Sequence, residues 1–158
     1  MRYLKKNSLN SVPKVIIDTN TFFSALYNPE GNEAHLLELA DKGKCSIQIL
    51  DYVLDELRNV FKRKEIDFNL VTDLLDTYDN IYVYELEDLD EEEIKLAKQN
   101  VKDASDRPIF VFAYRKIKQN DDVFFVSGDD GFFEEDVIQI LDERVYTTRE
   151  MLEKILSN

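Results

Sequence analysis

The chain has 158 residues, of which 44% are apolar and 34% are charged, with only four Gly and three Pro. This composition predicts one compact domain over residues 1–158 and excludes a disordered chain, with residues 1–12 as a loose N-terminal arm. No apolar run could span a membrane, no signal peptide is visible and Cys45 stands alone, so we expect a cytoplasmic protein with no membrane partner.

The net charge of −13 should repel polyanions overall. Basic residues nevertheless gather in short stretches, and Lys14, Arg58 and Arg107 are candidates for contacts with phosphate. Solvent-exposed helix faces that carry either positive or negative charges also explain this pattern. Charge therefore neither proves nor excludes a phosphate substrate.

The first third of the chain alternates between strands and helices. Val15–Ile17 is expected to form a buried strand, and Glu33–Lys42 has helical spacing up to Gly43, which ends the helix. Cys45–Leu50 predicts a second strand. An amphipathic helix follows over Asp51–Phe61.

The middle of the chain continues this alternation. We expect a helix over Phe68–Tyr78, a strand over Ile81–Tyr84 and a helix capped by Asp90, whose acidic first turn suits the helix dipole. Ala104–Ile117 predicts another helix and Val123–Val126 a fourth strand.

The last elements complete the expected fold. Phe132–Leu141 predicts a helix and Val145–Thr147 a short fifth strand, and Thr147 with Glu150 forms a capping box for a terminal helix. Short apolar strands separated by helices indicate a mainly parallel sheet of four to five strands. The predicted fold class is a three-layer α/β/α sandwich.

Several acids follow predicted strands or open predicted helices. Asp18 ends the first strand, Asp129 and Asp130 follow the fourth, and Glu56 borders the apolar stripe of its helix. Sites in parallel sheets form at the carboxyl ends of strands, so these acids can face one crevice.

The segment "KDASDRPIFVFA" adds Asp103 and Asp106 at the entrance of the next helix. Each acid has a simpler explanation: Asp18 can cap a helix, Asp106 with Pro108 can open one, and "GDDG" is ordinary turn chemistry. Taken together these explanations weaken, because carboxylates in one crevice repel each other unless protons or a cation hold them. Mg²⁺, which prefers oxygen ligands, would neutralise this repulsion.

Four segments resemble the acidic motifs of the PIN-domain ribonucleases, in order. They are "VIIDTNTFFSAL", "ILDYVLDELRNVF", "DASDRPIFVFA" and "FFVSGDDGFF". The tail "YTTREMLEKI" is similar to that of the PIN-type toxins of prokaryotic toxin–antitoxin systems. The resemblance covers the chain from about Val15 to its end.

The resemblance implies a PIN-like fold and a set of site residues. The four family acids fall on Asp18, Glu56, Asp106 and Asp129, which would act in catalysis and hold Mg²⁺ or Mn²⁺. Four further residues would support these acids or touch the substrate: Asn20, Ser127, Asp103 and Asp130. Asp103 is the alternative match to the third family acid. Asp130 is shifted by one position from the place where many family members have a second acid in the last loop.

The implied activity is hydrolysis of RNA phosphodiester bonds by a metal-dependent endoribonuclease, with RNA as substrate, an antitoxin as partner and a homodimer as a common assembly. No nucleophilic His or Cys is needed, and His35 is expected to be structural.

Three other protein classes share part of this pattern. A haloacid-dehalogenase-like phosphatase needs a second Asp where this chain has Asn20, and a receiver-like phosphoacceptor needs paired acids that "SVPKVII" lacks. A PIN-fold module that binds a partner protein and cuts nothing agrees with the charge of −13 and the altered fourth loop.

Overall fold

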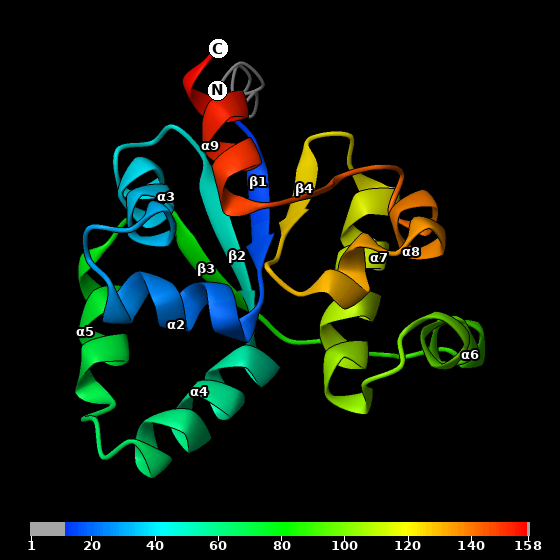
Figure 1. Ribbon diagram of the computed structural model, residues 1–158, viewed down its shortest axis with the longest axis horizontal. Coiled ribbons are helices and arrows are strands. Elements are labelled where there is room, and N and C mark those ends of the chain that lie inside the picture. The colour runs from blue at the N-terminus through cyan, green and yellow to red at the C-terminus, as the bar shows by residue number, and fades with distance from the viewer. Residues whose placement is uncertain (1–11, 158) are drawn as a thin grey trace.

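The computed structural model describes residues 12–157, which form a parallel sheet flanked by helices (Figure 1). The strands are β1 (Lys14–Ile17), β2 (Ser46–Leu50), β3 (Ile81–Tyr84), β4 (Val123–Val126) and β5 (Val145–Tyr146). The α helices are α2 (Thr19–Tyr27), α3 (Asn32–Asp41), α4 (Asp51–Arg63), α5 (Asn69–Thr77), α6 (Glu91–Asn100), α7 (Arg107–Gln119), α8 (Glu135–Ile140) and α9 (Thr148–Leu156). Two short 3-10 helices are η1 (Ala104–Asp106) and η2 (Asp130–Phe133).

All five strands are parallel, in the order β3-β2-β1-β4-β5. The three-layer α/β/α sandwich predicted from the sequence is confirmed, with a fully parallel sheet of five strands. The expected N-terminal arm falls almost wholly on residues 1–11, outside the described residues.

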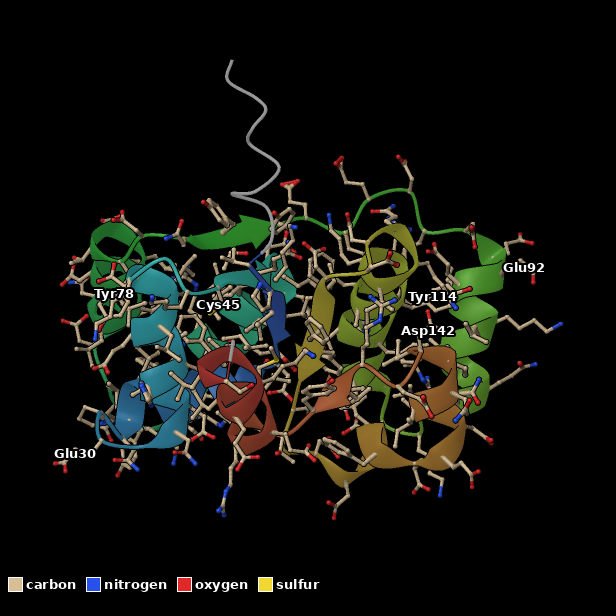
Figure 2. All side chains as sticks on the ribbon, turned by 90° about the horizontal axis from the view of Figure 1, so that it is seen from above. Glu30, Cys45, Tyr78, Glu92, Tyr114 and Asp142 are labelled. Carbon is tan, nitrogen blue, oxygen red and sulfur yellow. The ribbon has the colours of Figure 1, made fainter. Side chains whose placement is uncertain are left out.

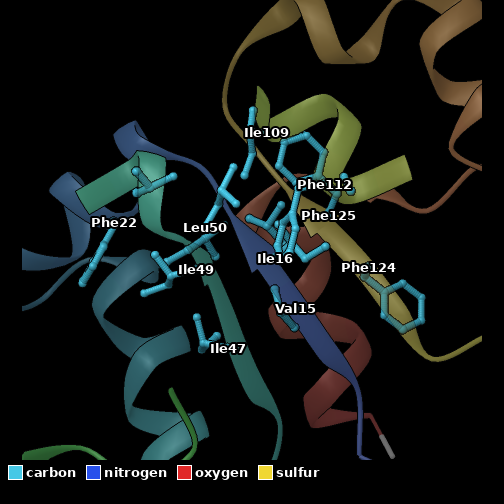
Figure 3. Packing of buried hydrophobic residues seen from close by; sticks show 14 of the residues in the cluster. Val15, Ile16, Phe22, Ile47, Ile49, Leu50, Ile109, Phe112, Phe124 and Phe125 are labelled. Carbon is cyan, nitrogen blue, oxygen red and sulfur yellow. The ribbon is translucent and has the colours of Figure 1, made fainter. Parts of the chain in front are cut away.

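The core lies on both faces of β1, the central strand. Val15, Ile16 and Ile17 are fully buried, so the strand has no polar face, as expected of a sheet covered on both sides. Ile16 lies opposite Phe125 of β4, and Figure 3 shows both beside Phe112 of α7. Burying each such side chain contributes about 1.5–3 kcal/mol.

Helices cover both faces and one end of the sheet (Figure 1). α3 packs with α2 and α9 on one side, and α7 packs with α6 on the other. α4 contacts both α2 and α7, so it bridges the two layers near the carboxyl ends of the strands.

The expected helix caps are present. Asp90 with Glu93, and Thr147 with Glu150, each form a reciprocal capping box. Gly43 has φ +81° just after α3, a conformation that Gly adopts without strain.

Two helix predictions need correction, and one helix was missed. The helix expected over Ala104–Ile117 begins as η1, because the Asp103 carboxylate accepts the Ser105 N–H and closes a tight turn. The helix expected over Phe132–Leu141 is split into η2 and α8 by the extended Glu134. Helix α2 was not predicted as an element, since its first turn, Thr-Asn-Thr, consists of weak helix formers.

The negative charge is spread widely over the surface. Figure 2 shows Glu30 and Glu92 projecting outward at opposite ends of the molecule. Within residues 12–157, no helix is long and apolar enough to cross a membrane.

Candidate active site

Four acids from four parts of the chain line one open cavity of about 330 Å³, which we call the acidic cavity. These acids are Asp18, Glu56, Asp106 and Asp129. β1 and β4 are neighbours, so the residues after Ile17 and Val126 leave the sheet side by side. The carboxyl ends of parallel strands therefore meet at this cavity, as the sequence indicated.

Asp18 is 7% exposed and lies at the junction of β1 and α2. One of its carboxylate oxygens accepts the Thr21 N–H at 2.9 Å, so Asp18 does cap a helix. The other oxygen accepts the Ser127 hydroxyl at 2.5 Å. Each carboxylate oxygen keeps a further lone pair, so capping does not exclude binding a cation.

Asp129 is positioned by the loop after β4. Its backbone N–H donates to the buried Ser127 hydroxyl at 3.0 Å, and its carboxylate accepts the Gly131 N–H at 2.9 Å. Phe132 anchors this loop by packing edge-on against Phe125, with 4.9 Å between the ring centroids. Ser127 thus links the carboxylate of one strand end to the backbone of the next.

Glu56 projects into the cavity from α4, between the buried Val53 and Leu57. The Thr19 hydroxyl donates a hydrogen bond to its carboxylate. Tyr52, one turn earlier on α4, has a raised pKa because it is partly buried and lies beside the Glu56 carboxylate. The contact with Thr19 ties α4 to the start of α2.

Asp106 lies among the other acids at the start of α7 and is partly buried. Burial raises its pKa to about 7, with further contributions from a hydrogen bond to Asp129 and from the negative charges of Asp129, Asp103 and Asp18. Its side chain caps no helix, which removes the simpler explanation for this residue. The crowding of carboxylates therefore favours the protonated form of Asp106.

Asp103 also lines the acidic cavity, but its carboxylate is engaged locally. It accepts the N–H of Ser105 at 3.0 Å and the hydroxyl of Ser105 at 2.8 Å, and these bonds lower its pKa. The structure thus separates the two candidates for the third acid by environment: Asp106 faces Asp129, whereas Asp103 is exposed and closes a turn.

The acids match a hard divalent cation in donor chemistry. Carboxylate oxygens suit Mg²⁺ and Mn²⁺, and the mutual repulsion of the carboxylates, which raises the pKa of Asp106, would be relieved by positive charge. Within residues 12–157, however, no three His, Cys, Asp or Glu side chains lie close enough together to hold an ion as they stand. The carboxylates would have to turn inward around an ion.

The remaining predicted residues are spread more widely. Asn20 lines the acidic cavity, whereas Asp130 is exposed at the start of η2 and is not part of the lining. His35 is exposed on α3, also outside the lining.

The three predicted phosphate contacts are engaged elsewhere. Lys14 pairs with Asp122 at 2.6 Å, at the opposite end of β1. Arg58 lies over the Phe68 ring at 4.2 Å, and Arg107 donates to the carbonyl oxygens of Val101 and Lys102.

Sequence reasoning missed part of the lining, namely Thr19, Asn59, Val60, Arg63, Ser105 and Ile109. The signal for Arg63 was its helical spacing, because it stands seven residues, or two turns, after Glu56. Nothing in the sequence marked Thr19 as a partner of Glu56.

Comparison with known proteins agrees with this geometry. A search of curated proteins finds no match. The sequence profile of the PIN domain matches residues 14–119, a span that holds Asp18, Glu56 and Asp106. Asp129 lies beyond that span and joins the other three through the pairing of β1 with β4. The chain therefore belongs to the PIN domain family, a family of nucleases.

Proposed function

We propose that the protein is an endoribonuclease that hydrolyses RNA phosphodiester bonds with Mg²⁺ or Mn²⁺ bound in the acidic cavity. The observation that carries this proposal is the convergence of Asp18, Glu56, Asp106 and Asp129 on one open cavity, where burial and the neighbouring carboxylates raise the pKa of Asp106. A partly buried carboxyl whose pKa is raised by neighbouring acids at an open cavity is more typical of functional sites than of a solvated surface.

Asp18, Asp106 and Asp129 would hold the metal, with Glu56 as a further ligand or as the group that orients the attacking water. A bound ion of this kind supplies an activated water and neutralises charge on the phosphate. Ser127 keeps the Asp18 carboxylate in place, and Thr19 does the same for Glu56.

The proposal extends to a toxin of a toxin–antitoxin pair. Its support is the resemblance of the "YTTREMLEKI" tail, which forms the end of β5 and the capped helix α9. On this proposal an antitoxin protein would fill the acidic cavity, and the active protein could be a homodimer.

The test is cleavage of single-stranded and structured RNAs with Mn²⁺, with Mg²⁺ and with EDTA. Asp106→Asn removes one ligand without changing side-chain volume and should abolish cleavage. Asp55→Asn is the matched control, because Asp55 is exposed on α4 beside Glu56 and the substitution makes the same charge change.

Cleavage that persists in EDTA or in the Asp106→Asn variant would contradict the metal-dependent mechanism. If calorimetry shows no Mn²⁺ binding at millimolar metal and no RNA is cut, the inactive PIN-fold interaction module is the better description.

A further inference from the structure

The acidic cavity is one of three cavities that meet at the candidate active site. The second, which we call the polar cavity, has a volume of about 400 Å³ and is lined by residues of α2, α3, the loop after β4 and the start of α9. Asn20 and Asp129 line both cavities, so the two meet beside the acids. A chain-like substrate can therefore enter through one cavity and leave through the other.

Each cavity has one arginine in its lining. Arg63 stands at the end of α4 in the acidic cavity, and Arg149 stands in the first turn of α9 in the polar cavity. The seven residues from Glu56 to Arg63 correspond to a rise of about 10 Å along α4. Arg63 is therefore set back from the acids and cannot be part of the metal site itself.

Arg63 and Arg149 make fewer or weaker polar contacts than Arg107 and Arg115 do. Arg63 has no carboxylate within ion-pair distance among residues 12–157. Arg149 has only Glu153, at 3.8 Å, with both side chains more than two-thirds exposed. By contrast, Arg115 makes two short bonds to Glu93. A surface pair such as Arg149–Glu153 contributes little and is easily exchanged for a phosphate.

We propose that Arg63 and Arg149 bind RNA phosphates on opposite sides of the scissile phosphate, so that the strand runs from the acidic cavity across Asn20 into the polar cavity. This inference rests on the proposed nuclease function and assigns its substrate path. The guanidinium groups would supply positive charge for a strand crossing a site whose own charge is strongly negative.

The binding test uses Asp106→Asn protein with Mg²⁺, so that RNA is not consumed. Arg63→Ala and Arg149→Ala should each weaken binding of single-stranded RNA roughly five- to twentyfold. Each should also lower the slope of log K against log salt by about 0.7. Arg58→Ala and Lys154→Ala are the matched controls on the same two helices, since both cations lie over aromatic rings and should leave the slope unchanged.

The direction of the strand is tested by cleavage. RNA oligonucleotides in which one phosphate is replaced by a neutral methylphosphonate should have a higher KM with the native protein, while kcat stays nearly constant. A neutral linkage on one side of the cut should have no further effect in Arg63→Ala, and one on the other side should have none in Arg149→Ala.

Three outcomes overturn the path. Either arginine variant could bind and cleave like the native protein, both could respond to linkages on the same side, or Lys102→Ala could show the loss expected of Arg63. The last result would send the strand through a third cavity, lined by Lys102 and Asp106. Binding that depends on both arginines without any cleavage would count against the nuclease and not against the path.

Discussion

At the residue scale, Asp106 and Asp103 show how two acids in one motif acquire different chemistry. They stand three residues apart and both line the acidic cavity. Burial and the negative charges of its neighbours raise the pKa of Asp106, whereas hydrogen bonds from Ser105 lower the pKa of Asp103. Asp103 accepts a backbone N–H from Ser105, so of these two acids Asp106 gains more by meeting a cation.

This difference predicts unequal effects of substitution on RNA cleavage. Asp106→Asn should lower kcat by at least a hundredfold, because it removes a proposed metal ligand. Asp103→Asn should lower it less than tenfold, because that side chain mainly closes the η1 turn. Single-turnover cleavage measures both, and equal losses would show that Asp103 is also a ligand.

The raised pKa predicts that metal binding releases a proton. An ion must displace the proton of Asp106, so the apparent Mn²⁺ affinity should rise as the pH rises toward about 7 and then level off. Calorimetry at pH 6.5 in buffers of different ionisation enthalpy should show the released proton for the native protein and none for Asp106→Asn. A binding enthalpy that does not depend on the buffer contradicts the prediction.

The same pKa has a consequence for stability without metal. The folded pKa of Asp106 lies above its ordinary value of 3.8, so the folded state holds more protons between these two values and stability falls as pH rises through that window. At pH 8, Asp106→Asn should therefore raise Tm by about 2–6 °C, and the gain should shrink toward pH 5. Asp55→Asn should show no such pH-dependent gain.

At the scale of elements, the segment before α6 is held to α7 by one arginine. Arg115 on α7 makes two bonds to Glu93 of α6, at 2.6 and 3.0 Å, and donates to the carbonyl oxygens of Glu87 and Asp88. Its guanidinium group lowers the pKa of Glu93. Arg115 therefore serves the fold and is not available to RNA.

Removing this contact should destabilise the protein. Glu93→Gln should cost about 1–2 kcal/mol in the free energy of unfolding, measured by urea titration at pH 7. Since the folded pKa of Glu93 is depressed, its contribution is present above the ordinary value of 4.5 and is lost as the pH falls below it. Glu92→Gln, exposed on the same turn (Figure 2), should change stability little.

The sequence predicted the elements that are defined by local patterns. Buried runs such as Val15–Ile17 could form only covered strands, and acids that follow such strands had to meet at one edge of the sheet. The grouping of Asp18 and Asp129 therefore followed from the sequence once the sheet was known to be parallel.

The phosphate contacts could not be predicted in the same way. Lys14 and Arg58 are as basic as Arg63, but where their charges lie depends on tertiary contacts with Asp122 and with Phe68. Helix α2 was missed because its first turn has weak local propensity and depends on the Asp18 cap and on packing.

At the scale of the whole molecule, a net charge of −13 acts against both folding and RNA binding. Self-repulsion destabilises the compact state, and the surface acids are spread over the protein (Figure 2). The acidic cavity adds local repulsion that a divalent ion would relieve.

Salt should therefore change stability and RNA binding in opposite directions. Raising NaCl from about 0.02 to 0.3 M shortens the Debye length several-fold, so Tm should rise by a few degrees while RNA affinity falls. Thermal scans and binding titrations over this range measure both trends. A Tm that falls with added NaCl would mean that attractive ion pairs outweigh the self-repulsion.

The hydrogen bond from Ser127 to Asp18 joins residues 109 positions apart in the chain. During synthesis Asp18 leaves the ribosome long before Ser127 and Asp129 are translated. The acids can therefore come together only after β4 has been translated and has paired with β1. A nascent chain thus has no complete acidic cavity until it has been translated past Asp129. If the protein cuts RNA as proposed, it cannot attack the message that encodes it before that point.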